Sequence, residues 1–158
     1  MKILRIDDRL IHGQVVAGWV RPLGIQVLVL ASDDISQDEW ACTAYSMAIP
    51  EGIKFLCVSI AKCTEIILSQ EVKRTMIVVG SVPDAHELIK YGLPVKEITI
   101  GGLSYREGTR EISSYIYFAP EDIVATAQIY NMGIKVIGKQ LPNSSPIDIV
   151  KVLAGVKQ

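Results

Sequence analysis

The sequence predicts a single-domain α/β fold over residues 1–158, built on a mostly parallel open sheet of about seven strands with helices on both faces. Short apolar runs alternate with segments of helical periodicity along the whole chain, which is typical of successive β-α units. The chain is 49% hydrophobic with a mean hydropathy of +0.32, which fits strands buried on both faces. A chain of 158 residues buries roughly two-thirds of its unfolded surface, so it needs no disulfide or metal to stabilise it.

Each strand is predicted from a short apolar run, and each helix from apolar residues spaced three or four apart. In chain order, the expected strands are residues 2–6, 25–30, 54–58, 75–80, 97–100, 115–118 and 135–137. The expected helices are residues 13–21, 36–48, 60–69, 84–91, 121–132 and 146–153.

Several elements also carry signals at their ends. Val15 and Trp19 are four residues apart, so they share one face of the first helix. Pro83 fits a first helical turn, and so does Pro120, which is followed by two acidic residues. Gly133 fits the position just past a helix end. No repeat, linker or low-complexity tract divides the chain into further domains.

The composition excludes some classes of partner. A net charge of −1 gives no basic surface for nucleic acid or an anionic membrane. No apolar run reaches the roughly 18–20 residues of a membrane span, and the start of the chain lacks the pattern of a signal peptide. We therefore expect a cytoplasmic protein. Cys42, Cys57 and Cys63 are odd in number and lack CxxC spacing, so we expect reduced core thiols.

The turn after the first strand concentrates polar side chains. Residues 5–15 read Arg-Ile-Asp-Asp-Arg-Leu-Ile-His-Gly-Gln-Val, and they follow the carboxyl end of a strand, where ligands bind in open α/β sheets. His12 stands where a helix should begin. Because a helix start offers unpaired N–H groups and a partial positive charge, the sequence predicts an anion site here, with phosphate the usual ligand.

His12 and Arg9 are the candidate catalytic residues. A neutral imidazole can attack phosphorus, and Gly13 beside it lets the backbone approach a ligand. The guanidinium of Arg9 can bridge two phosphate oxygens. The alternatives are that His12 is a capping or packing residue and that Arg9 forms a salt bridge with Asp7 or Asp8.

The neighbouring acids and a later pair of glycines are candidate orienting groups. Asp7 or Asp8 could accept a hydrogen bond from the imidazole and fix its tautomer, or cap the loop backbone. Gly101 and Gly102 follow the strand at residues 97–100 and could offer amides to phosphate or sugar, or simply form a turn. No metal-ligand spacing and no nucleotide-binding glycine motif is present, so we expect neither a metal nor a cofactor. His86 is expected on a helix surface.

These motifs resemble the histidine-phosphorylated enzyme IIB components of the mannose/fructose/sorbose class of the sugar phosphotransferase system (PTS). The resemblance covers essentially the whole chain, through residues 5–15, the Gly101-Gly102 pair, residues 133–136 and residues 141–143. It implies that His12 accepts a phosphoryl group on its Nδ1 (pros) nitrogen from a IIA protein. His12 would pass that group to a sugar presented by a membrane IIC/IID complex. Family members typically have Asn two residues before the glycine pair, where this chain has Thr99.

The resemblance therefore implies a protein-Npi-phosphohistidine–sugar phosphotransferase that is cytoplasmic and peripheral to a membrane transporter. It leaves open the sugar (mannose, fructose, sorbose or an amino-sugar such as N-acetylgalactosamine) and whether the chain forms a homo-oligomer. The residues alone leave two other functions open. One is a non-catalytic module that binds a phosphorylated metabolite at the His12 loop, and the other is a different α/β enzyme with His12 as general base.

Overall fold

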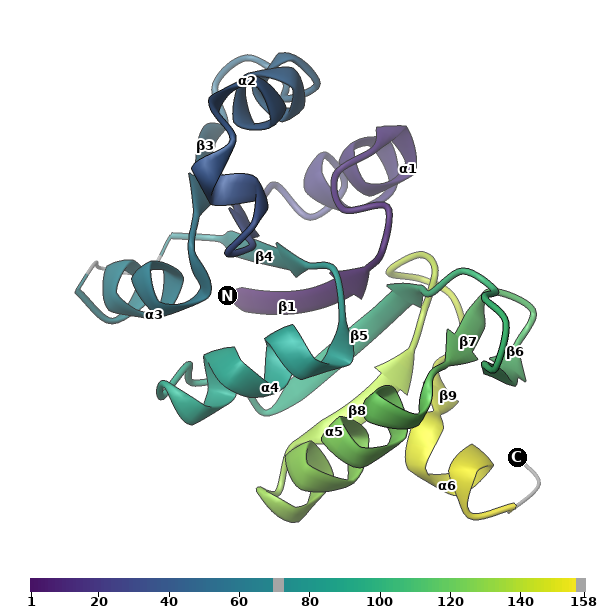
Figure 1. Cartoon of the computed structure of the whole chain (residues 1–158). Coiled ribbons are helices and arrows are strands. Elements are labelled where there is room, and N and C mark those ends of the chain that lie inside the picture. Colours follow the sequence, from purple (N-terminus) through teal and green to yellow (C-terminus); the bar gives the residue numbers. More distant parts are fainter. Residues whose placement is uncertain (70–72, 156–158) are drawn as a thin grey trace.

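Seven strands of the described chain form the central sheet, in the order β3-β2-β4-β1-β5-β8-β9 (Figure 1). The computed structural model describes residues 1–69 and 73–155. All neighbouring strands in the sheet run parallel except β8 and β9. The strands are β1 Lys2–Asp7, β2 Val27–Ala31, β3 Lys54–Val58, β4 Thr75–Val79, β5 Glu97–Gly102, β8 Lys135–Gly138 and β9 Ile147–Asp148. The predicted α/β class is confirmed.

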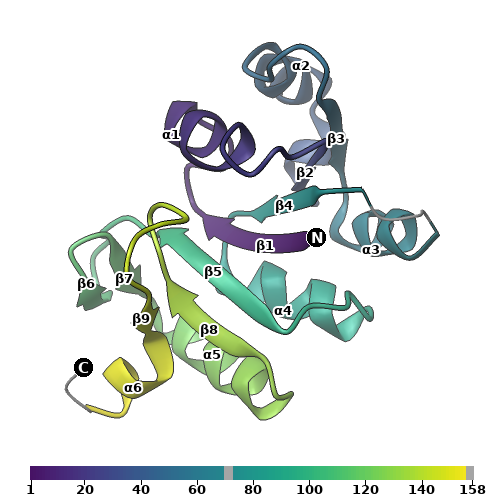
Figure 2. The same ribbon diagram turned by 180° about the vertical axis from the view of Figure 1, so that it is seen from behind.

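The helices cover both faces of this sheet, as the two opposite views show (Figures 1 and 2). One face carries α1, its continuation η1, the 3₁₀ turn η2 and α2, and the other carries α3, α4, α5 and α6. Their bounds are α1 Gly13–Val15, η1 Val16–Val20, η2 Ile35–Gln37, α2 Glu39–Met47, α3 Ile60–Ser69, α4 Val82–Lys90, α5 Pro120–Asn131 and α6 Ile149–Leu153. Within the described residues, no helix combines the length and apolar character needed to cross a bilayer.

Alternation along the strands builds two separate apolar cores. In β1, Leu4 and Ile6 face the core under α3, α4 and α5, whereas Ile3 packs with the core under α1 and α2. Since successive side chains of a strand point to opposite faces, Arg5 and Asp7 share the α1 face with Ile3. β1 lies between β4 and β5, so its carboxyl end is flanked by the ends of both neighbouring strands.

Two sequence-based expectations about strands are wrong. The segment 115–118 does not join the central sheet, because β7 (Ile116–Phe118) pairs antiparallel with β6 (Arg110–Ser113) in a separate two-stranded ribbon. The seventh strand is β9, which occupies the beginning of the segment 146–153 that periodicity predicts as a helix. A two-residue strand is too short to show any periodicity, and β6 depends on pairing rather than on an apolar pattern of its own.

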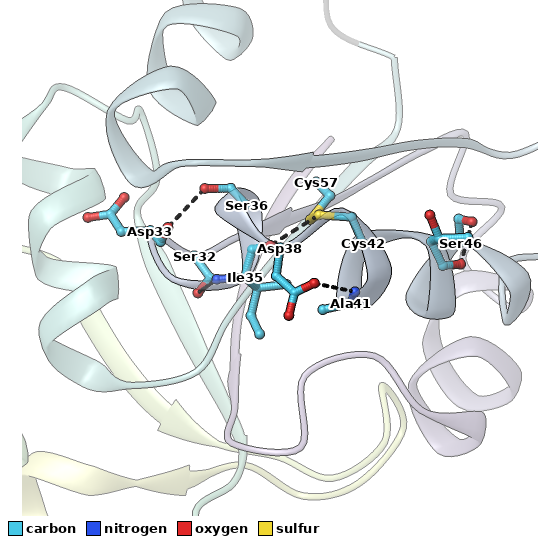
Figure 3. The surroundings of a disulfide bond; sticks show 10 residues. Ser32, Asp33, Ile35, Ser36, Asp38, Ala41, Cys42, Ser46 and Cys57 are labelled. Atoms are coloured by element: carbon cyan, nitrogen blue, oxygen red, sulfur yellow. Dashed lines mark hydrogen bonds between the residues drawn. A yellow bond between two sulfur atoms is a disulfide. The ribbon is translucent and has the colours of Figure 1, made fainter.

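The expectation of reduced core thiols is wrong for Cys42 and Cys57 and confirmed for Cys63. Cys42 on α2 and Cys57 on β3 form a disulfide, with Cα atoms 5.9 Å apart (Figure 3). They meet because α2 packs on the face of the sheet toward which Cys57 of the edge strand β3 points. Their separation of 15 residues in the sequence does not predict this proximity. Cys63 on α3 is a free thiol and is buried, and burial raises its pKa to about 12.

Candidate functional site

The loop between β1 and α1 is anchored by its two apolar residues. Leu10 and Ile11 are buried in the core beneath α1 and α2. Leu10 has a φ of 57°, a left-handed conformation that costs a non-glycine residue about 1–2 kcal/mol. The N–H of Leu10 donates to the carbonyl of Asp7 at 2.9 Å, and the N–H of Asp8 donates to the carbonyl of Gly102 at 3.1 Å. Burial of these side chains thus holds a sharp turn that presents Arg9 and His12 at the surface.

His12 precedes the first residue of α1 and is held by Asp7. Its Nε2 lies 3.1 Å from Oδ2 of Asp7, and the imidazole is 19% exposed. Because an ionised carboxylate only accepts hydrogen bonds, this contact assigns the proton of a neutral ring to Nε2. Nδ1 then carries the lone pair, and it has no hydrogen-bond partner in residues 1–69 and 73–155.

Asp7 is in turn paired with Arg5, a residue that the sequence reasoning misses. Nη2 of Arg5 donates to Oδ2 of Asp7 at 3.0 Å, and both side chains are fully buried. Burial lowers the pKa of Arg5 from its ordinary value, and the adjacent Asp7 carboxylate opposes that shift. A signal was available: charged side chains are almost never fully buried unless paired, and Asp7, two positions along the strand, is on the same face as Arg5.

Two further contacts, with Trp19 and Lys139, fix the guanidinium of Arg5. Its Cζ lies 4.9 Å from the centroid of the Trp19 ring, and Nη1 donates to the carbonyl of Lys139 at 3.2 Å. Nε1 of Trp19 donates to the carbonyl of Gln140 at 2.7 Å. At Gly18 a Cβ would collide with the Leu141 side chain. The segment after β8 is therefore packed against η1, a π-helical turn of the kind that often occurs near functional sites.

Gly101 has a clear packing role beside its predicted one. A Cβ at this position would collide with the guanidinium of Arg5, so only glycine leaves room for the buried ion pair. A Cβ at Gly102 would lie 3.9 Å from Oδ1 of Asp7, an ordinary contact. From the sequence, Gly101 is expected to offer a backbone amide to a ligand or to form a turn. In the structure, its missing side chain makes space for the guanidinium of Arg5.

Asp8 and Asp7 have different contacts. The carboxylate of Asp8 points to the loop after β5, where it accepts the Ser104 N–H at 2.7 Å and the Ser104 hydroxyl at 3.2 Å. Asp7 contacts His12 and Arg5, and its Oδ1 accepts the N–H of Arg9 at 3.2 Å. Of the two acids, Asp7 is therefore the one placed to orient the imidazole, and Asp8 fixes the neighbouring loop.

The Arg9 side chain, in the same β1-α1 loop as His12, is 55% exposed. Its Nε lies 3.6 Å from Oδ1 of Asp7, and Nη2 donates to Oε1 of Gln14 at 3.4 Å. Both contacts are long, and although Asp7 is buried the guanidinium of Arg9 is solvated, so we expect the pair to contribute only about 0–1 kcal/mol. Arg9 is thus not locked into a structural ion pair. A Cβ at Gly13 would meet no atom within 4 Å, so packing does not require glycine there.

Thr99 and His86, which are also considered from the sequence, form no hydrogen bond or ion pair with His12, Asp7 or Arg9 within the described residues, although Thr99 is the register partner of Arg5. Thr99 is buried within β5 and lines a cavity of about 750 Å³ toward the amino ends of the strands. His86 lies half-buried on α4, against the opposite face of the sheet.

Comparison with known proteins agrees with this fold. The family model described as the PTS system sorbose subfamily IIB component matches residues 1–158. The fructose-specific EIIB component of Bacillus subtilis is 30% identical over 156 residues, covering 98% of this chain and 96% of that protein. The IIBSor domain of the Klebsiella pneumoniae sorbose permease superposes with a TM-score of 0.89 at 26% identity, covering 98% of this chain and 96% of that one. An N-acetylgalactosamine IIB component of Streptococcus pyogenes gives a TM-score of 0.87 at 28% identity over 94% of each chain. Because the family model matches all 158 residues and solved IIB structures share the fold, this chain belongs to the sorbose subfamily of PTS IIB components.

Proposed function

We propose that the chain carries a phosphoryl group on Nδ1 of His12 during PTS-dependent sugar uptake. The observation that carries this proposal is the contact between Nε2 of His12 and the buried carboxylate of Asp7. It leaves the lone pair on Nδ1, on a ring that is partly exposed. The buried pair of Arg5 and Asp7 supports the same assignment, since it fixes the carboxylate that orients the ring.

In the first step, a phosphorylated IIA protein presents its phosphohistidine to His12. The Nδ1 lone pair attacks phosphorus in line, the N–P bond of the donor breaks, and its electron pair returns to the donor imidazole. No proton needs to move, because Nε2 of His12 keeps its hydrogen bond to Asp7 throughout.

Arg9 and the first amides of α1 neutralise the phosphoryl oxygens. Arg9 is exposed and lacks a tight ion pair, so its planar fork is available for two oxygens. Gly13 adds no side chain between the backbone and such a ligand. Asp7 remains behind the ring and does not meet the phosphoryl group.

In the second step, a membrane IIC/IID complex presents a sugar. A sugar hydroxyl attacks phosphorus, the bond between Nδ1 and phosphorus breaks, and the hydroxyl proton is released to solvent. This chain then acts as a protein-Npi-phosphohistidine–sugar phosphotransferase in the cytoplasm, peripheral to the transporter. Its relatives are named for fructose, sorbose and N-acetylgalactosamine, and we propose a sugar of this group. A module that merely binds a phosphorylated metabolite would have no use for an oriented nucleophile.

Phosphorylation driven by phosphoenolpyruvate tests the proposal. We expect the general PTS proteins and a cognate IIA protein to label one residue, with acid-labile and alkali-stable phosphate. With ¹⁵N-labelled imidazole, NMR should place phosphorus on Nδ1 of His12. Phosphate on Nε2, on His86 or on Cys63 would contradict the assignment.

Arg9 should affect the transfer rate far more than the stability. Arg9→Lys retains the charge but loses the fork, so a partial defect is expected. Arg9→Ala should slow phosphoryl exchange with IIA by about 10²–10³-fold, the usual effect of removing one preorganised donor. The free energy of unfolding should change by less than about 1 kcal/mol. Rapid-quench exchange and a denaturant melt measure the two quantities.

Arg21→Ala is the matched control, because Arg21 is another exposed arginine, at the end of η1. It should leave both quantities unchanged. If Arg9→Ala exchanged at the wild-type rate but unfolded markedly earlier, Arg9 would be a structural partner of Asp7 instead.

A further inference from the structure

A polar pocket of about 380 Å³ adjoins the His12 loop and shares only Arg9 and backbone near it with the phosphoryl exchange described above. Its size lies within the roughly 300–1,000 Å³ of small-molecule sites. Arg9 and Gln14 line one side, so the pocket begins where the phosphoryl group would be held. The lining comes from the β1-α1 loop, α1, the end of β5 and the loop that follows it, the segment between β6 and β7, β7 itself, and the loop after β8. It comprises Asp8, Arg9, Gln14, Gly101, Gly102, Leu103, Ser104, Tyr105, Ser114, Tyr115, Tyr117 and Gln140.

Three tyrosines give the pocket an aromatic wall. The rings of Tyr105 and Tyr117 meet edge to face, with centroids 5.7 Å apart. Tyr105 is 68% exposed although its neighbour supports it, and Tyr115 is half-buried. An exposed aromatic ring held by a second ring offers a flat apolar surface for the C–H face of a sugar.

The polar groups of the pocket are open to a ligand. Among the described residues, no hydrogen-bond partner is found for the side chains of Ser114 and Gln140 or for the Tyr117 hydroxyl. The carboxylate of Asp8 is already engaged by Ser104. Hydroxyl and amide groups of this kind can both donate and accept, which suits the several hydroxyls of a hexose.

The positive charge of the pocket is confined to its Arg9 end, and the carboxylate of Asp8 in the lining is occupied by Ser104. Arg9 is the one basic side chain among the described residues that line it, and the opposite wall is neutral and aromatic. A ligand with a single anionic group at one end and a polyhydroxylated ring at the other matches this distribution. A nucleotide with several phosphates does not.

We propose that this pocket receives the sugar ring during the second transfer, with its phosphorylated or reacting end at Arg9 and its ring against Tyr105. The inference rests on the proposed function and assigns that function a sugar subsite on this chain, in addition to the site on the membrane complex. The ring contacts would then contribute to the choice of sugar, because a site built to bond hydroxyls discriminates against analogues that lack them.

Binding measurements on the unphosphorylated chain test the subsite directly. Titration calorimetry and saturation-transfer NMR would use D-mannose 6-phosphate, D-fructose 1-phosphate and inorganic phosphate. At least one sugar phosphate should bind about ten-fold tighter than inorganic phosphate, since the sugar ring can stack and form hydrogen bonds that inorganic phosphate cannot make. Tyr105→Ala should weaken that binding about five-fold and leave the affinity for inorganic phosphate unchanged.

Tyr130→Ala is the control, because Tyr130 is a comparably exposed tyrosine on α5, on the far face of the sheet. It should change neither affinity. Gln140→Ala offers a second variant that removes a polar group without touching the tyrosines, and it should also weaken only sugar phosphate binding. Equal affinities for sugar phosphates and inorganic phosphate, or an unaltered sugar affinity in Tyr105→Ala, would overturn the subsite.

Labelling of His12 by phosphorylated IIA separates this failure from failure of the proposed function. The pocket variants should be labelled at the wild-type rate, because Tyr105 and Gln140 do not contact the imidazole. If His12 is labelled normally while sugar phosphates show no preference for the pocket, the subsite is wrong and the carrier function stands. If the wild-type chain is not labelled at all, the carrier function itself is wrong.

Discussion

His12→Gln should abolish phosphorylation of the chain by IIA while leaving the fold intact. Glutamine cannot form the phosphoramidate, so the label should fall to background. Its side-chain amide can still donate to Asp7 in place of Nε2–H, and position 12 lies in a surface loop. The free energy of unfolding should therefore stay within about 0.5 kcal/mol of the wild-type value. Phosphoenolpyruvate-driven labelling and a denaturant melt of the same preparation measure the two effects.

His86→Gln provides the matched control for this substitution. The two histidines of the chain are His12 and His86, and His86 lies on α4, against the opposite face of the sheet. The His86→Gln variant should be labelled as fast as the wild-type chain. Undiminished labelling of His12→Gln would show that another residue is the acceptor.

Arg5→Met should be the most destabilising single change at the site. The substitution leaves the fully buried carboxylate of Asp7 without its buried cation, with only the longer contact to the exposed Arg9 remaining, and breaking a buried pair in this way costs about 3–5 kcal/mol. It also removes the contact with Trp19 and the hydrogen bond to Lys139. A denaturant melt should show the loss, and phosphoryl exchange should slow because the carboxylate that orients His12 is no longer fixed.

Two further variants distinguish the buried pair from ordinary surface charges. Lys62→Ala breaks the exposed pair of Lys62 with Glu65 on α3 and should cost less than about 1 kcal/mol. Gly101→Ala keeps Arg5 but fills the space that its guanidinium occupies, so it should also destabilise the fold, by about 1–3 kcal/mol. If Arg5→Met were as stable as Lys62→Ala, the network behind His12 would have no energetic importance.

The sequence predicts the central sheet and its helices because both depend on hydrophobic patterns between residues that are near one another in the chain. Apolar runs and helical spacings identify the parallel strands and most helices, and the polar cluster of residues 5–15 stands out against the apolar strand that precedes it. Residues 115–118 form a strand as predicted but lie outside the central sheet, and residues 147–148 are predicted as helix, because the partners of short strands are not encoded locally. The same holds for Cys42 and Cys57, which meet only through the packing of α2 on the sheet face beside β3.

The candidate site likewise contains residues that the sequence predicts and residues that it does not. His12, Arg9 and the two acids are close in sequence, so their association is foreseeable, although which acid meets the imidazole is not. Arg5 is overlooked because it sits within a strand that is otherwise apolar. The tyrosines of the pocket are missed because Tyr117 on the β6-β7 ribbon and Tyr105 on the loop before it come beside Arg9 only in the folded chain.

The buried pair of Arg5 and Asp7 also determines when the imidazole of His12, the proposed nucleophile, is ordered. A flexible side chain that must be immobilised for each reaction loses about 0.5–1.5 kcal/mol of rotational freedom every time. Here the imidazole is already restrained by a carboxylate whose own position is set by packing. The entropy of alignment is therefore lost once, when the polypeptide folds, and does not recur in each catalytic cycle. A phosphoryl carrier that reacts with two different partners avoids this entropy loss twice per turnover, because the ring is already oriented when each partner binds.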